Sequence, residues 1–149
     1  MDRADPAIAI LVPCHNEAVA IQGVIQGFRA HLPSAVIYVY DNNSTDDTAR
    51  LAREAGAVVR REERQGKGQV IRRMFADIEA DIYIIVDGDN TYDPASAPVL
   101  VAALRGGPLD LVNGVRVENG DTAYRPGHRF GNRLLTRLVT RFFGSASRD

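Results

Sequence analysis

The chain has 149 residues, of which 45% are hydrophobic and 25% charged, and its formal net charge is −1. This composition fits one soluble globular domain with its own core, and it gives no general attraction to nucleic acid. No run approaches the about 20 apolar residues of a membrane span, the N-terminus lacks the apolar core of a signal peptide, and the single cysteine, Cys14, excludes an internal disulfide.

An apolar run over residues 7–12 predicts the first strand. Pro13 ends this run, because proline cannot donate a hydrogen bond to a central strand ladder. The polar loop after it carries Asn16 and Glu17, and apolar residues at helical spacing then predict a helix over 17–30. These polar residues are therefore expected where the first strand ends.

A second strand is predicted over 36–40, and it also runs into polar residues. Ser44 or Thr45 can cap the helix that follows, since a hydroxyl oxygen accepts a hydrogen bond from a free amide in the first turn. A helix cap does not account for Asp41 and Asn43, which stand at the end of the strand. These two side chains are therefore candidates for binding a ligand beside the first loop.

Lys67 is the single lysine of a chain with seventeen arginines, and a glycine stands on each side of it. The preceding helix is expected to end at Gly56, with a third strand over 57–60 and a further helix over 68–80. The flanking glycines let the backbone approach a ligand, and an ammonium group is a compact partner for a phosphate. The spacing is neither that of a Walker P-loop nor that of a dinucleotide-binding glycine loop.

Two carboxylates, Asp87 and Asp89, follow a run of β-branched and aromatic residues, 82–86. We expect this run to be a parallel strand buried on both faces. Residues two apart on an extended chain point the same way, so the carboxylates can converge just past the strand. Paired carboxylates suit Mg²⁺ or Mn²⁺. Taken alone, the motif also fits a solvated Asp-Gly turn.

The remaining elements are a helix over 94–104, a fifth strand over 109–114 and a last helix over 128–143. Alternating strands and helices predict an α/β fold with a mostly parallel sheet sandwiched by helices. Three of the strands end in polar motifs at one edge of this sheet, where such folds bind their ligands.

These motifs resemble family 2 glycosyltransferases, which have the Rossmann-like GT-A fold, and particularly the dolichol-phosphate and other polyprenyl-phosphate sugar transferases. The resemblance covers nearly the whole chain, in order, and rests on four stretches: 12–17, 41–46, 66–68 and 87–89. It implies one nucleotide-sugar-binding domain over 1–149, truncated at its C-terminus. The residues that would line the donor's pocket are Pro13, Asn16, Glu17, Asp41, Asn43 and Lys67.

The same resemblance implies the chemistry of the site. Asp87 and Asp89 would hold the catalytic cation, with Thr91 in the place of a third metal-side residue. Asp149 would be a further catalytic aspartate. The expected reaction is metal-dependent inverting transfer of a sugar from a UDP- or GDP-sugar to an acceptor, a polyprenyl phosphate in cell-envelope glycan synthesis. Such a phosphate needs no general base, because it is largely deprotonated at pH 7.

The predicted helix over 128–143 carries Arg129, Arg133, Arg137 and Arg141 among bulky apolar residues. This pattern suits an anionic membrane surface, and the resemblance makes Arg116 and Arg129 candidates for the lipid phosphate. We therefore expect a cytoplasmic enzyme lying at the inner face of the membrane. The alternative is a helix packed on the sheet with a solvated charged side.

Two other functions are compatible with the sequence. Residues 87–91 also match the Asp-x-Asp-x-Thr motif of haloacid dehalogenase-type phosphatases, in which the first aspartate, here Asp87, is the nucleophile. In that family the motif sits on the first strand with a lysine downstream, whereas here no lysine follows it. The second alternative is a module that binds a nucleotide sugar without catalysis.

Overall fold

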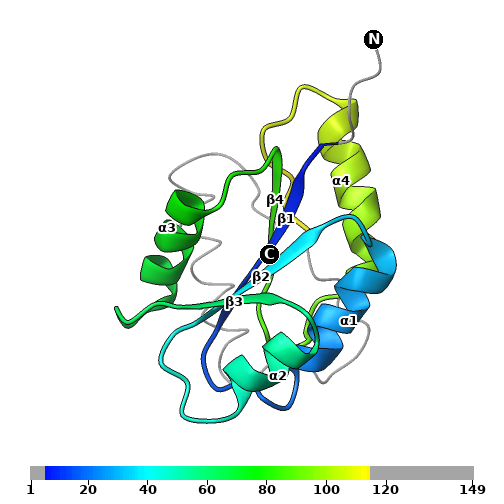
Figure 1. Cartoon of the computed structure of the whole chain (residues 1–149). Helices are drawn as coiled ribbons and strands as arrows, with labels where there is room; N and C mark the ends of the chain where they lie inside the picture. The colour runs from blue at the N-terminus through cyan, green and yellow to red at the C-terminus, as the bar shows by residue number, and fades with distance from the viewer. Residues whose placement is uncertain (1–5, 115–149) are drawn as a thin grey trace, which may run out of the picture. The chain divides into compact units, whose positions relative to one another are not determined.

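Four parallel strands form the sheet in the part of the chain that this computed structural model describes, residues 6–114 (Figure 1). The sheet order is β3-β2-β1-β4, so the first strand lies inside the sheet, with β2 on one side of it and β4 on the other. The bounds of the strands are β1 (Ile8–Cys14), β2 (Val36–Asp41), β3 (Val58–Arg61) and β4 (Ile82–Ile85).

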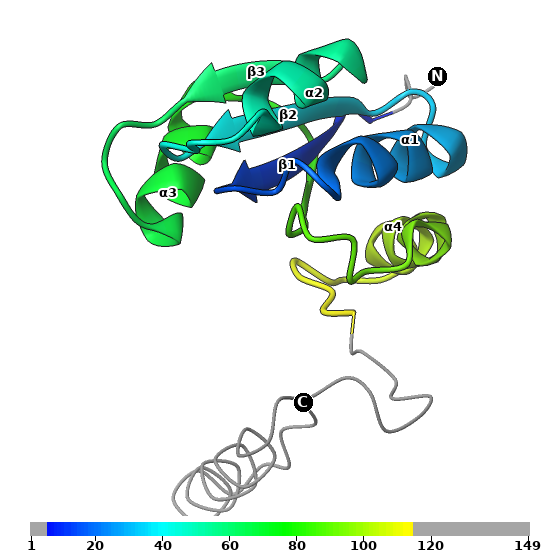
Figure 2. The same cartoon turned by 90° about the horizontal axis from the view of Figure 1, so that it is seen from below.

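Helices cover both faces of this sheet (Figures 1 and 2). Their bounds are α1 (Ile21–His31), α2 (Thr48–Glu54), α3 (Lys67–Asp77), η1 (Pro94–Ser96) and α4 (Ala97–Gly106). Alternate residues of β1 divide the core between the two faces, as the pleat of a strand requires. Ile10 and Val12 pack with α1 and α2, whereas Leu11 packs with Val70 and Met74 of α3. The predicted α/β sandwich is therefore confirmed for the described residues.

The register of the sheet brings the ends of neighbouring strands level. Cys14, the last residue of β1, pairs with Asp41, the last residue of β2, and Asp41 pairs with Arg61 at the end of β3. On the other side, Ile85 pairs with Leu11, so Asp87 comes just after the end of β4. The polar motifs after these strands consequently start from one edge of the sheet, as predicted.

Two predicted helix starts are wrong, and both errors have the same cause. The helix predicted over 17–30 begins at Ile21, and the helix expected after Ser44 or Thr45 begins at Thr48 with no side-chain cap. The hydroxyl of Ser44 accepts instead from the backbone of Asn16, at 2.9 Å. Contacts between the two loops thus replace the local capping that the sequence favoured.

Two predictions about strands are also wrong. Residues 109–114 contain no strand, and Leu111 is 83% exposed. No described strand pairs with this segment, so it has no ladder to join. The strand that precedes Asp87 is not buried throughout, because Ile85 at the end of β4 is 44% exposed. Gly56 was predicted correctly, since it takes a φ of 89° at the end of α2.

Candidate functional site

A pocket of about 250 Å³ lies at the carboxyl edge of the sheet. The loops after β1, β2 and β4 and the first turns of α3 all contribute to it. Its lining residues are Pro13, Cys14, His15, Glu17, Asn42, Lys67, Val70, Asp87, Gly88 and Asp89. The motifs that the sequence analysis singled out on separate strands therefore meet in one cavity.

Lys67 reaches across this pocket to the first carboxylate of the pair. Its ammonium group donates a hydrogen bond to Asp87 Oδ1, although twenty residues separate the two in the sequence. The ion pair is partly open to water, with side chains 57% and 34% exposed. Partly exposed pairs of this kind contribute little to stability. The ammonium group is therefore placed at the pocket without being locked in a buried salt bridge.

Asp89 is oriented by its own loop. Its Oδ1 accepts from the backbone nitrogen of Thr91, at 3.0 Å, and from the Thr91 hydroxyl, at 2.7 Å. Thr91 does not line the pocket. Thr91 was expected at the metal side of the site, and in the structure its hydroxyl holds the second carboxylate.

A third carboxylate, Glu17, faces the same pocket. Burial raises the pKa of Glu17, and the negative charges of Asp89 and Asp87 raise it further. Among residues 6–114, no three His, Cys, Asp or Glu side chains are grouped so as to hold a metal ion by themselves. Asp87 and Asp89 thus fit a hard cation that takes its other oxygens from a phosphate and from water, as Mg²⁺ usually does.

Cys14 lines the pocket as a neutral thiol. Burial raises the pKa of this thiol far above its ordinary range, and the carboxylates of Glu17 and Asp41 raise it further. Its thiolate is therefore unavailable at neutral pH, and the side chain acts as a small filler.

Asn16 connects the first loop to the second. It has a φ of 58°, and its Oδ1 accepts from the backbone of Thr45, at 2.8 Å. Beside it, the backbone nitrogen of Glu17 donates to Thr48 Oγ1, at 2.8 Å. These bonds fix the loop after β1 and leave the Asn16 side chain outside the pocket lining.

Asp41 and Asn43, both expected to bind the donor, lie beside the pocket and not in its lining. Asp41 is 7% exposed, and its Oδ1 accepts from the backbone of Ser44, at 3.3 Å. Asn43 has a φ of 64°, and its Nδ2 donates to the carbonyl of Glu63, at 2.9 Å. Asp41 therefore holds its own loop, whereas Asn43 holds the neighbouring loop that contains Glu63.

Two polar residues of the lining, His15 and Asn42, were not singled out from the sequence. The Nδ1 of His15 lies 2.9 Å from the carbonyl oxygen of Asn42, so this nitrogen carries the proton and donates. Nε2 can then accept from Asn16 Nδ2, at 3.4 Å. The only signal in the sequence was their position inside the motifs that end β1 and β2.

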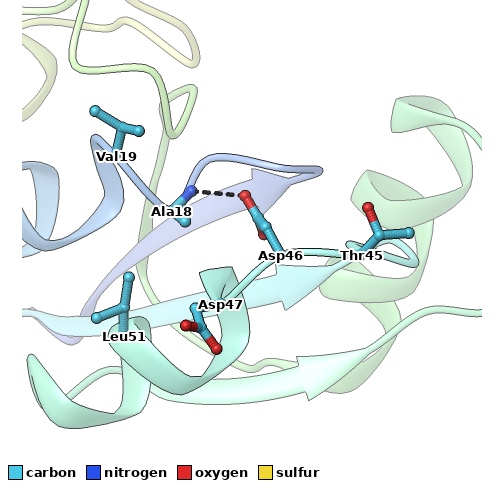
Figure 3. Close-up of a pocket in the computed structure, with 6 residues that line it drawn as sticks. All are labelled: Ala18, Val19, Thr45, Asp46, Asp47 and Leu51. Atoms are coloured by element: carbon cyan, nitrogen blue, oxygen red, sulfur yellow. Dashed lines mark hydrogen bonds between the residues drawn. The ribbon is translucent and has the colours of Figure 1, made fainter.

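A larger, open hollow of about 540 Å³ lies beside the start of α2 (Figure 3). Its lining residues are Ala18, Val19, Thr45, Asp46, Asp47 and Leu51. Both carboxylates are engaged within the protein: Asp46 accepts from the backbone of Ala18, at 3.1 Å, and Asp47 pairs with Arg50. This hollow therefore lacks the convergent polar groups of the smaller pocket.

The remaining predicted site residues lie outside the described part of the chain. They are Arg116, Arg129 and Asp149, and the helix predicted over 128–143 lies there as well.

The open parallel sheet, with a lysine and two carboxylates at its carboxyl edge, is that of a Rossmann-like α/β protein, and the solved structures with this fold are GT-A glycosyltransferases. A family profile described as "Glycosyl transferase family 2" matches residues 9–146, and the chain belongs to this family. This membership rules out the phosphatase alternative. It also agrees with the order of the motifs, because Asp87 follows the fourth strand and not the first.

Several curated proteins resemble the chain. It is 54% identical over 123 residues to Protein RfbJ of Shigella flexneri, covering 82% of this chain and 95% of RfbJ. It is 37% identical to Glycosyltransferase AglJ of Haloferax volcanii, covering 96% of this chain and 47% of AglJ. A Dolichyl-phosphate hexose transferase of the same archaeon is 26% identical, with 95% of this chain and 62% of that protein covered. The chain thus spans about half the length of AglJ.

Solved structures show the same fold. Glucosyl-3-phosphoglycerate synthase from Mycobacterium tuberculosis, in complex with Mn²⁺, UDP-glucose and phosphoglyceric acid, matches with a TM-score of 0.63 and 29% identity. The match covers 70% of this chain and 41% of that chain. The same enzyme in complex with Mg²⁺ and UDP matches with the same TM-score.

Proposed function

We propose that the chain transfers a sugar, with inversion, from a UDP- or GDP-sugar to an acceptor in a reaction that depends on a divalent cation. The observation that carries this proposal is the convergence of Lys67, Asp87 and Asp89 on one pocket. Family membership supports it, as do the UDP-glucose and Mn²⁺ in the mycobacterial synthase.

In this proposal each described residue has a role toward the donor. Asp87 and Asp89 would hold Mg²⁺ or Mn²⁺, which supplies charge neutralisation for the departing nucleoside diphosphate. Lys67 would exchange its contact with Asp87 for the diphosphate, since this ion pair is partly open to water. Thr91 would keep Asp89 in its orientation.

The base and ribose would lie on the other side of the pocket. Pro13 and Glu17 line it directly, whereas Asp41, Asn16 and Asn43 would shape it from behind. We place Asp41 with the nucleoside and not with the metal, because it ends a different strand from the one before Asp87.

For the acceptor we propose a polyprenyl phosphate, with Arg116 and Arg129 as its partners. Guanidinium forks bind phosphate oxygens with two parallel hydrogen bonds. The similarity to a protein named Dolichyl-phosphate hexose transferase supports this choice. A hydroxyl acceptor would instead need a carboxylate base, for which Asp149 is the candidate.

We further propose a cytoplasmic protein whose segment 128–143 binds the inner membrane surface. No helix within residues 6–114 is both long and apolar enough to cross a membrane. Co-sedimentation with anionic vesicles should show binding that weakens with salt and with substitution of Arg133, Arg137 and Arg141 by Gln. If the wild-type protein ignores anionic vesicles at low salt, a soluble acceptor replaces the lipid.

A thermal-shift panel tests the function most simply. Nucleoside diphosphates are added with and without Mn²⁺, and binding at about 100 times the dissociation constant adds roughly 2.7 kcal/mol to the unfolding free energy. Transfer of labelled sugar to polyprenyl phosphate is then measured with the best donor. Binding without transfer to polyprenyl phosphate or to a soluble acceptor would support the non-catalytic module, and no binding of any nucleotide would contradict the proposal.

A further inference from the structure

We infer that Asn42 is a positioning residue for Lys67. The buried side-chain amide of Asn42 fixes the loop that carries the lysine into the pocket. This inference rests on the proposed role of Lys67 at the donor's diphosphate. The loop, residues 62–66, joins the end of β3 to the start of α3. Within it, the backbone nitrogen of Arg64 donates to Glu62 Oε1, at 2.7 Å, and several of its other backbone groups are bound from the loop after β2.

The carboxamide of Asn42 binds this loop at three points. Nδ2 donates to the carbonyl oxygens of Glu62 and Arg64, both at 2.8 Å. Oδ1 accepts from the backbone nitrogen of Gly66, also at 2.8 Å. Both amide protons are therefore used, and the residue is only 5% exposed. A buried amide with all these bonds made holds a single orientation.

Asn42 is itself held to the first loop. Its backbone nitrogen donates to the carbonyl of Cys14, at 2.8 Å, and its carbonyl accepts from His15 Nδ1, at 2.9 Å. The amide is thus attached to the level ends of β1 and β2, which are the two central strands of the described sheet. The loop at 62–66 consequently takes its position from the ends of these two central strands.

The last of the three bonds reaches the residue directly before Lys67. Gly66 has a φ of 119° and begins α3 by accepting from the backbone nitrogens of Gln69 and Val70, at 2.9 and 3.3 Å. Val70, 1% exposed, anchors the following turn in the core. Lys67 therefore lies between two fixed points, and its ammonium group is directed to Asp87.

An aspartate at position 42 would have nearly the same shape as the asparagine, but it would repel part of the loop that the asparagine holds. Its oxygen could still accept from Gly66, but the other oxygen would face two carbonyl oxygens where an amide now donates. Two hydrogen bonds would become two repulsive contacts, and a buried charge would lack a partner. The substitution therefore disturbs the loop while changing the volume of the side chain very little.

The test compares a nucleoside diphosphate with its own nucleoside, in the presence of Mn²⁺. The pairs are UDP with uridine and GDP with guanosine, and the pair that binds the wild-type protein is chosen. Its affinity is then measured for Asn42→Asp, for Lys67→Met and for the double variant. We expect Asn42→Asp to weaken the diphosphate about tenfold, comparable with losing one hydrogen bond to a charged group. The nucleoside should change less than about twofold, and the double variant should bind no more weakly than Lys67→Met alone.

Because Asn42 itself lines the pocket, two further variants are needed to separate the loop effect from the added charge. Gln69→Glu introduces the same negative charge into the first turn of α3, at an exposed side chain. It should leave the affinity for the diphosphate within about twofold. Asn42→Ala removes the three bonds without adding charge, so it should also weaken the diphosphate more than the nucleoside. It serves alone if Asn42→Asp does not fold by circular dichroism.

The possible failures are distinguishable. If Lys67→Met leaves diphosphate binding unchanged, the proposed role of the lysine is wrong. If Lys67→Met weakens binding but Asn42→Asp does not, the inference about Asn42 is wrong. The inference is also overturned if the two effects multiply in the double variant, if the nucleoside weakens as much as the diphosphate, or if neither variant of Asn42 folds.

Discussion

The sulfur of Cys14 lies so close to Gly88 that a Cβ built on this glycine would be 2.7 Å from it. The same Cβ would lie 3.3 Å from Cγ of Glu17. Cys14 is 3% exposed and has little room to move aside. The absence of a side chain at Gly88 therefore lets the segment with Asp87 and Asp89 pass directly over the loop after β1.

This contact predicts that Gly88→Ala destabilises the protein by about 1–3 kcal/mol, the usual cost of overpacking. Urea unfolding measures the loss. The double variant Cys14→Ala/Gly88→Ala should be more stable than Gly88→Ala, because the sulfur is gone. Gly68→Ala is the control, since its Cβ would meet nothing within 4 Å and helical alanine is favoured. Equal stability of the single and double variants would contradict the steric account.

Tyr40 connects β2 to α3 through its hydroxyl. This group donates to Asp77 Oδ2, at 3.0 Å, and accepts from Arg60 Nη1, at 3.3 Å. Tyr40→Phe should lower the unfolding free energy by about 1 kcal/mol. Tyr38→Phe, two residues earlier on the same face of β2, is the matched control and should be nearly neutral. An equal loss in both variants would show that the ring, and not the hydroxyl contacts, matters.

Asp77 should make stability depend on pH in the acidic range. The hydrogen bond from Arg73 lowers the pKa of this carboxyl most, and those from Tyr40 and Arg60 lower it further, although desolvation opposes them. The folded pKa thus lies below the unfolded value of about 3.9, so the stabilisation is present above that pH and lost as pH falls through the folded pKa. The stability difference between wild type and Asp77→Asn should therefore be largest at neutral pH and shrink below about pH 4. Replacing Arg73 by Gln should reduce this pH dependence, and a difference that grows in acid would contradict the sign.

Much of this fold could be predicted because its signals are local. The apolar runs that became β1, β2 and β4 each stop at a polar motif, and the alternation with helices predicted parallel strands whose ends meet. The end of α2 at Gly56 was also predictable from one residue, because glycine readily takes the positive φ, 89°, found there. Such features need no knowledge of distant residues.

The wrong predictions concern places where residues far apart in the sequence determine the local structure. The backbone nitrogens of Asn16 and Glu17 donate to hydroxyls about thirty positions away, and this delays the start of α1. The hydrogen bonds from the Asn42 side chain also reach residues some twenty positions away. An asparagine in a polar loop does not by itself predict such bonds. The segment 109–114 has strand-like composition, but a strand also needs a partner, which sequence composition does not supply.

We propose that Asp87 and Asp89 bind the cation that accompanies the nucleotide. The most direct measurement is the thermal shift given by a nucleoside diphosphate with and without Mn²⁺, in wild type and in Asp87→Asn/Asp89→Asn. The control, Glu79→Gln/Asp110→Asn, removes two exposed carboxylates elsewhere. The account predicts that the control keeps the additional shift caused by Mn²⁺, whereas the site variant stays folded and loses it. An unchanged Mn²⁺-dependent shift in the site variant would contradict the account.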